Sequence, residues 1–353
     1  MQPPNHYMAA AVSLGDAAVF VMKKNVRKLT KLQLAVFLLL PLIMVLLGLC
    51  FGRLMLSPVE VFSALFGGGT GQSRTVVLSM RLPRLLMACA VGTGLSVAGC
   101  TFQNLFANPL ATPDTLGVAS GASFGAALAM LIGFRLVGIQ LLSMVFGIAA
   151  VAITGLMGSR VNQSRSTPIL AGIMVGSLFN SLLSLAKFTA DTDAQLPAIT
   201  YWLMGSMETA GYSTLLLGVP PIVICTVILL LLRWRMNLLP LGEDEAVSTG
   251  VNLPRLRRTA QLCAAILTAS CISMCGQVGW VGLIVPHLCR MRYGSSNVVL
   301  LPACVSMGMS FMVVVDTLAR TLSPKEIPIS VLTALVGAPF FLYLLKKYRR
   351  WTV

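Results

Sequence analysis

Charged residues are scarce in this sequence. Asp, Glu, Lys and Arg make up 10% of the 353 residues, whereas 56% are hydrophobic and the mean hydropathy is +0.85. A soluble domain carries about 25% charged residues, so this composition argues against a soluble protein and suits a chain that lies in lipid. No polar linker or shift in composition divides the sequence, and we therefore expect a single membrane domain.

Catalytic and nucleotide-binding motifs are also lacking. No lysine follows a glycine, so the glycine-rich phosphate loop of ATPases is absent, and the two histidines, His6 and His287, lie far apart. We expect neither an enzyme nor a bound cofactor in this chain. The nine cysteines lie almost entirely in apolar runs without a CxxC pair, which indicates packing residues rather than a metal site.

The net charge of +15 raises the question of nucleic-acid binding. The basic residues sit at the ends of apolar runs and are not gathered on one face between aromatics, which argues against nucleic acid. Cytoplasmic loops of membrane proteins keep such an excess of Lys and Arg. A basic collar ending at Lys31 precedes the first apolar run, so we expect a cytoplasmic N-terminus.

About 20 apolar residues are needed for a helix to cross the hydrocarbon. This length predicts ten spans, which would return the C-terminus to the cytoplasm, and it leaves short helices near Pro58–Phe66 and 199–205 at the outer side. The expected spans are 32–51, 85–106, 116–134, 136–157, 168–187, 215–232, 259–275, 276–289, 298–318 and 329–345.

Acidic residues near or inside these spans are few. Asp114 lies near the start of a span, and Asp316 lies four residues before Arg320, the spacing of an intrahelical ion pair. A charge inside a span usually marks a pathway, but the ion pair favours a structural role for Asp316.

Two segments of the sequence resemble each other, Gly117–Phe124 and Gly172–Phe179. Each has small residues four positions apart, which predicts close packing of helices.

Five motifs occur in a fixed order along the chain. They are RLPR (81–84), NPLATPDTLGVASGA (108–122), LGEDEAVSTG (241–250), GQVGWVGLIVPHLCR (276–290), and DTLAR followed by EIPISVLTALVGAPFFLYLL (316–345). Together they resemble the permease subunits of bacterial ABC importers for iron–siderophores, haem and cobalamin. The resemblance covers 32–347; the extension and collar at 1–31 and the cytoplasmic tail at 348–353 lie outside it.

The resemblance implies an all-α fold of ten transmembrane helices in the bacterial inner membrane. It also implies a second permease subunit, two cytoplasmic ATPase subunits that hold ATP and magnesium, and an extracytoplasmic substrate-binding protein. The cargo would be an iron–siderophore or a related metal chelate, with haem or cobalamin as alternatives. An ion-coupled secondary transporter is a weaker alternative, because it would need a coupling site at mid-membrane.

Roles for particular residues follow from the same resemblance. Arg81, Arg84 and Arg320 match the arginines that pair with glutamates of the binding protein in the cobalamin importer. Arg165 departs from the small polar residue expected at its position, which weakens that part of the gate. The gate and pathway would involve Gln103, Asn104, Asn108, Leu110, Arg165, Ser166 and Thr167, and the ATPase-coupling segment Gly242, Glu243, Asp244, Glu245, Ala246 and Gly250.

Overall fold

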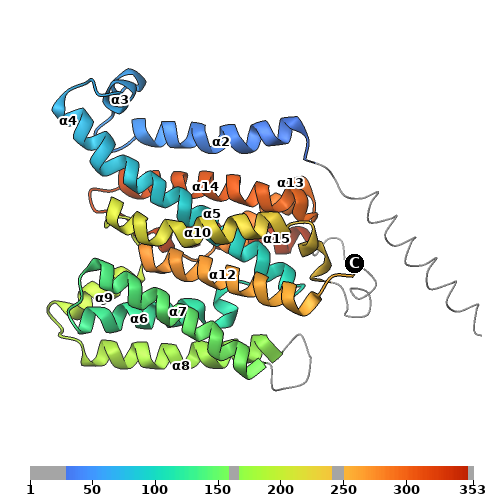
Figure 1. Ribbon diagram of the computed structural model, residues 1–353. Helices are drawn as coiled ribbons and strands as arrows, with labels where there is room; N and C mark the ends of the chain where they lie inside the picture. The colour runs from blue at the N-terminus through green and yellow to red at the C-terminus, as the bar shows by residue number, and fades with distance from the viewer. Residues whose placement is uncertain (1–28, 159–166, 241–249, 349–353) are drawn as a thin grey trace, which may run out of the picture.

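The computed structural model describes residues 29–158, 167–240 and 250–348, and in these ranges it contains helices and connections but no strand (Figure 1). The elements are α2 (Lys31–Cys50), α3 (Pro58–Leu65), α4 (Gly71–Arg74), the π-helical η1 (Thr75–Arg81), α5 (Leu82–Leu105), the 3-10 helix η2 (Pro113–Leu116), α6 (Val118–Leu131), α7 (Leu136–Gly158), α8 (Thr167–Thr189), α9 (Gln195–Leu203), α10 (Tyr212–Leu232), the 3-10 helix η3 (Arg235–Leu238), α12 (Leu253–Cys275), α13 (Val281–Tyr293), α14 (Asn297–Thr321) and α15 (Ile329–Tyr348).

Each of the ten predicted spans corresponds to a helix, so the all-helical membrane fold is confirmed. Among the described residues, 7 helices are long and apolar enough to cross a membrane, and α6 and α15 are shorter apolar helices. The prediction was wrong at some boundaries. Residues 71–81 are helical and continuous with α5, so this helix runs for 35 residues, and α13 has 13 residues and begins at Val281 instead of 276.

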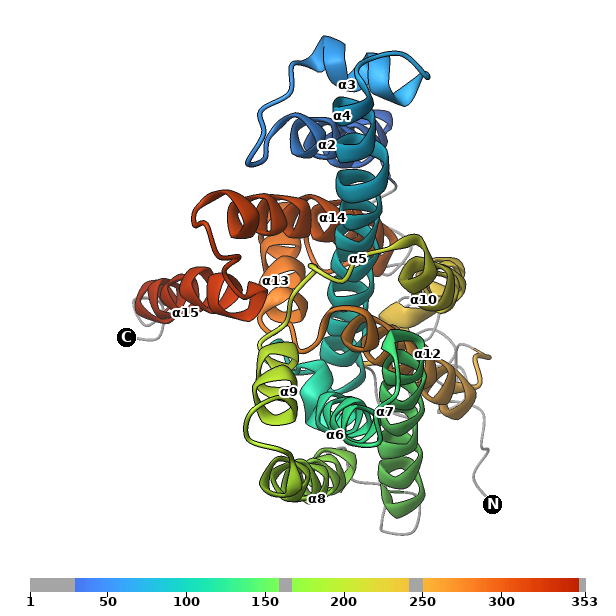
Figure 2. The ribbon, with the colours of Figure 1, turned by 90° about the vertical axis from the view of Figure 1, so that its left-hand side faces the viewer.

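The helix α5 is the centre of the bundle. It lies against α14, α12, α13 and α10, and the view in Figure 2 shows it passing between α14 and α10. Backbones approach closely where α5 carries glycine: a Cβ on Gly92 would lie 2.1 Å from the carbonyl oxygen of Gly308 on α14. A Cβ on Gly99 would lie 1.9 Å from the carbonyl oxygen of Gly282 on α13. Small residues therefore fix how tightly α5 packs against its neighbours.

The helices α6, α7 and α8 pack against one another on one side of α5. Here a Cβ on Gly172 would lie 2.0 Å from the carbonyl oxygen of Thr115, just before α6. This contact confirms the close packing predicted from the two similar glycine patterns. Phe124, Phe146 and Phe179 fill the space between the three helices, with ring centroids 5.2 to 6.3 Å apart.

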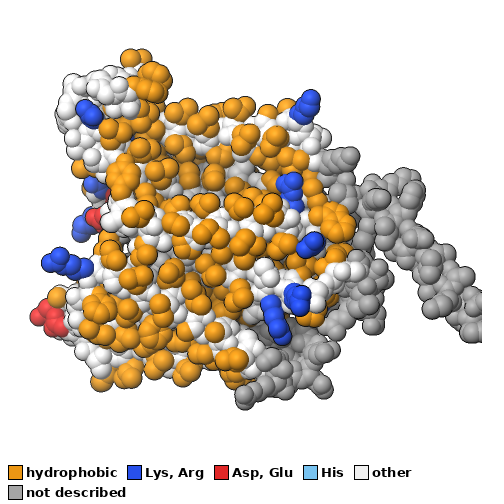
Figure 3. All heavy atoms as spheres, viewed as in Figure 1, with side chains coloured by type: hydrophobic (Ala, Val, Ile, Leu, Met, Phe, Trp, Pro, Cys, Tyr) orange, Lys and Arg blue, Asp and Glu red, His pale blue; other side chains and the backbone are white. Residues whose placement is uncertain are grey.

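The lateral surface is apolar on the face shown in Figure 3, and the charged side chains of this face lie near the two ends of the bundle. At the end where α10 finishes and α12 begins, basic residues predominate, and the described connection from α5 to α6 contributes one carboxylate, that of Asp114. The other end carries both signs of charge. The basic residues near the first end include Arg233, Arg235, Arg255, Arg257, Arg258, Arg290 and Arg292.

Candidate functional site

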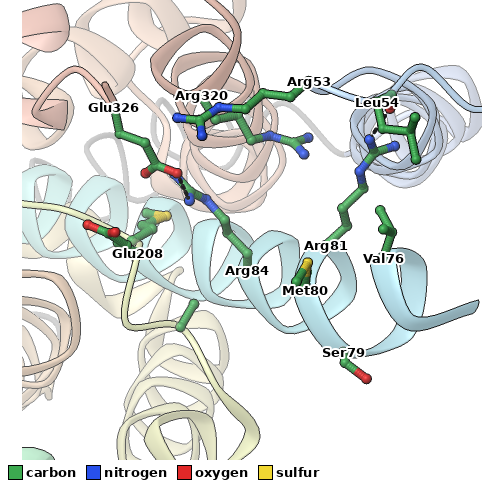
Figure 4. A pocket seen from close by; sticks show the side chains of 12 residues that line it. Arg53, Leu54, Val76, Ser79, Met80, Arg81, Arg84, Glu208, Arg320 and Glu326 are labelled. Carbon is green, nitrogen blue, oxygen red and sulfur yellow. Dashed lines mark hydrogen bonds and ion pairs between the residues drawn. The ribbon is translucent and has the colours of Figure 1, made fainter. Parts of the chain in front are cut away.

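A cavity of about 520 Å³ opens at the end of the bundle that carries both signs of charge. Four arginines and two glutamates line it, and Figure 4 shows them gathered between the ends of α2, α5 and α14. Arg81 and Arg84 are three residues apart and therefore lie on the same side of one helix. The charged lining consists of Arg53, Arg81, Arg84, Glu208, Arg320 and Glu326.

Two of these arginines bind the C-terminus of α2. The last carbonyl groups of a helix lack partners within the helix and carry partial negative charge. Arg81 donates to the carbonyl oxygens of Leu49, Cys50 and Leu54, and Arg320 donates to that of Gly48. The guanidinium groups thereby satisfy carbonyls that a helix end would otherwise leave unpaired.

Arg84 joins α14 to the loop that follows it. Its Nε lies 2.7 Å from Oδ1 of Asp316, and its Nη1 lies 2.8 Å from Oε1 of Glu326. Asp316 is fully buried and also lies 3.6 Å from Nε of Arg320, which confirms the ion pair predicted within this helix. Arg53, which follows α2, donates to the carbonyl oxygen of Pro324 at 2.6 Å and so binds the same loop after α14.

The arginines predicted to dock a binding protein are thus engaged within the chain. Arg81 is 5% exposed and Arg320 is 7% exposed, and both use their donors on backbone carbonyls. Arg84 faces the cavity, but two carboxylates of the same chain already pair with it. Docking through these arginines stays a prediction, and a partner would have to bind beside or in place of Glu326.

Gln103 and Asn104 were expected on the pathway wall, but both are buried between helices of the same chain. The amide of Gln103 donates to the carbonyl of Gly282 at 3.2 Å, and its oxygen accepts from Arg290. Asn104 donates to Oδ1 of Asn297 at 2.7 Å. These amides join α5 to α13 and α14, and a role for Gln103 and Asn104 on the pathway stays a prediction.

The remaining predicted residues fall in three places. Asn108 and Leu110 form an exposed turn after α5, where Oδ1 of Asn108 accepts from the backbone N–H of Leu110 at 2.9 Å. Thr167 is the first residue of α8, and Gly250 has a left-handed backbone with φ +70° before α12. Arg165, Ser166 and the coupling residues Gly242, Glu243, Asp244, Glu245 and Ala246 lie outside the described residues.

A second cavity, of about 680 Å³, lies among α6, α8, α9, α12 and α15. Its lining combines small and apolar side chains with several polar ones, and Asp114 contributes the one carboxylate among the described lining residues. Trp280 also lines it and has a left-handed backbone, with φ +67°. The polar members of the lining are Asp114, Ser120, Asn180, Gln277 and Ser330.

Sequence reasoning missed several of these residues. Arg53, Glu208 and Glu326 lie in loops or at helix ends, and their spacing gives no sign that they meet. Trp280 lies in the motif GQVGWVGLIVPHLCR (276–290), but the motif alone does not predict a role for it. Its ring stands where a side chain on Gly337 would be, at 2.5 Å from that position, and this pairing across 57 residues has no local signal.

Known proteins resemble this chain along most of its length. Residues 39–347 match the model of the FecCD transport family. The chain is 41% identical over 318 residues to the molybdate import system permease protein MolB of Haemophilus influenzae, covering 88% of this chain and 94% of the relative. It is 36% identical over 334 residues to the hemin transport system permease protein HmuU of Yersinia pestis, covering 92% and 98%.

A solved structure agrees with this relationship. It is an inward-facing conformation of a metal-chelate type ABC transporter, with a TM-score of 0.83 and 39% identity, covering 90% of this chain and 99% of that one. The fold and the apolar lateral surface define a multi-pass membrane transport subunit. The chain belongs to the FecCD transport family, the permeases of type II ABC importers, in which ATPase activity lies in partner subunits.

Proposed function

We propose that this chain forms part of the membrane pathway of an ATP-driven importer for a metal chelate, with an iron–siderophore as the leading candidate. The observation that carries the proposal is the second cavity, a space with polar lining among helices long enough to span a membrane. Its volume of about 680 Å³ within one chain suits a solute larger than a simple ion. Haem and cobalamin remain alternatives of the same class.

The proposed assembly places a second permease subunit beside this one, two ATPase subunits below it and a binding protein above it. The basic end of the bundle, where arginines predominate, would face the cytoplasm. The acidic segment around Glu243, Asp244 and Glu245 follows η3 and precedes α12, both at this end, which would suit contact with an ATPase. The cavity with arginines would then face outward, toward the binding protein.

The direct test is uptake by the purified complex. The chain and its ATPase would be reconstituted in liposomes, with ATP enclosed in the lumen and the binding protein added outside. We expect these liposomes to import a ferric siderophore. Liposomes loaded with a non-hydrolysable ATP analogue are the control. Uptake driven by an ion gradient without ATP would favour a secondary transporter, and ATP hydrolysis by the isolated chain would contradict the proposal.

Coupling to the ATPase has its own test. Replacing Glu243, Asp244 and Glu245 together with alanine should weaken co-purification of the ATPase and reduce uptake. Ser248→Ala in the same segment is the control and should leave both unchanged. Wild-type association and uptake after the triple replacement would remove the coupling role.

A further inference from the structure

Asp114 stands out in the second cavity because nothing described there neutralises it. The residue is exposed to the cavity, and the described lining includes no Lys or Arg. The buried carboxylate of Asp316, by contrast, lies within 4 Å of two arginines. A charge left without a partner among spanning helices usually marks a functional position.

The surroundings of Asp114 strengthen its effect on a solute. The other polar lining groups are hydroxyls and amides, which are uncharged. Low-dielectric walls around a cavity concentrate the field of a charge inside it. The potential in this cavity is therefore negative as far as the described residues determine it.

We infer that this cavity selects solutes by charge, favouring a cationic or neutral metal chelate over an oxyanion such as molybdate, with Asp114 as the residue that determines the preference. The inference rests on the proposed function, because it takes the cavity as part of the solute's route. It also narrows that function: a dianion would meet repulsion at Asp114, whereas a ferric trihydroxamate, which has no net charge, would not.

The charge of the cavity can be measured without transport. Ser120, on α6, lines the same cavity as Asp114 and would be replaced by cysteine in the full chain bound to its ATPase. The probes are a trimethylammonium and a sulfonate methanethiosulfonate of similar size. None of the nine native cysteines lines this cavity, and the chain without Ser120→Cys gives their background reaction.

We expect the cationic reagent to react with this thiol at least about tenfold faster, relative to the anionic reagent, than it does with a thiol in free solution. Asp114→Asn should remove most of this preference, and Asp114→Glu should keep it. Asp193→Asn, an exposed carboxylate outside the cavity lining, is the matched control and should change nothing. An unbiased wild-type ratio, or a ratio that Asp114→Asn leaves intact, would overturn the inference.

Uptake assays separate this inference from the proposed function. With wild-type complex, ATP-driven uptake of a ferric trihydroxamate and exclusion of molybdate support both, while Asp114→Asn should admit more molybdate. Wild-type uptake of molybdate in preference to the trihydroxamate would overturn the charge selection and leave ATP-driven import standing. If ATP drives no uptake of either probe, the proposed function fails for these solutes, and the thiol ratio still decides the charge of the cavity.

Discussion

The two cavities are similar in size and opposite in how they treat charge. The cavity with arginines, about 520 Å³, holds four arginines and two glutamates, and most of these groups pair with each other or with backbone carbonyls. The second, about 680 Å³, holds one described carboxylate without a described counterion. In the first cavity charge holds helices together. In the second, no described group pairs with the carboxylate of Asp114, which is what the proposed selection of solutes by charge requires.

The largest effect should come from removing the carboxylate at the centre of the arginine cluster. Asp316→Ala leaves Arg84 and Arg320 buried beside each other with less compensation, and breaking a buried pair in this way costs about 3–5 kcal/mol. Thermal unfolding of the purified chain in detergent should show a large fall in Tm. Leu318→Ala, at a neighbouring position that is 41% exposed, is the control and should have a small effect.

Removing the orphaned charges should then recover part of the loss. Asp316→Ala combined with Arg84→Met should be more stable than Asp316→Ala alone, because the second change removes a buried guanidinium group that has lost one of its two carboxylate partners. If the fall in Tm of the double variant equals the sum of the falls for Asp316→Ala and Arg84→Met alone, the ion pair is not what stabilises this end of the bundle.

A smaller effect is expected from the amides between α5 and α14. Asn104→Ala leaves Oδ1 of buried Asn297 without its donor at 2.7 Å, which costs about 1–3 kcal/mol. Asn297→Ala should cost a similar amount, and the double variant should lose less than the sum of the two, as measured by Tm. If Asn104 instead acted mainly on the pathway, uptake would fall while Tm stayed unchanged.

A still smaller effect is expected at the rim of the cavity with arginines. The side chain of Glu326 is 19% exposed, and such partly solvated pairs contribute about 1 kcal/mol or less. Glu326→Gln should lower Tm slightly and, by freeing Arg84, should strengthen binding of the binding protein if that partner pairs with Arg84. Binding measured at two salt concentrations checks this: weaker binding after Glu326→Gln would contradict docking through Arg84.

The contrast between the cavities also shows how far the sequence could be interpreted alone. Hydrophobic run length predicted the spans, and the four-residue spacing predicted the pair of Asp316 with Arg320, because both depend on one helix. The pair of Arg84 with Asp316 joins residues 232 apart, and only the packing of α5 on α14 brings them together. Gln103 shows the same limit: its residue type is visible in the sequence, but its contacts with Gly282 and Arg290 depend on how α5 packs against α13.

Asp114 gives the smallest expected change in stability and the sharpest separation of the two cavities. The sequence placed this residue near the start of a span, and its cavity depends on helices that begin far along the chain, including α9, α12 and α15. Because no described group pairs with its carboxylate, Asp114→Asn should change the free energy of unfolding by no more than about 0.5 kcal/mol. The comparison is with Asp316→Asn, which removes the same charge from a buried ion pair and should lower Tm clearly. A loss of stability at Asp114 as large as that at Asp316 would mean that its charge, too, serves the fold, and the distinction between the cavities would disappear.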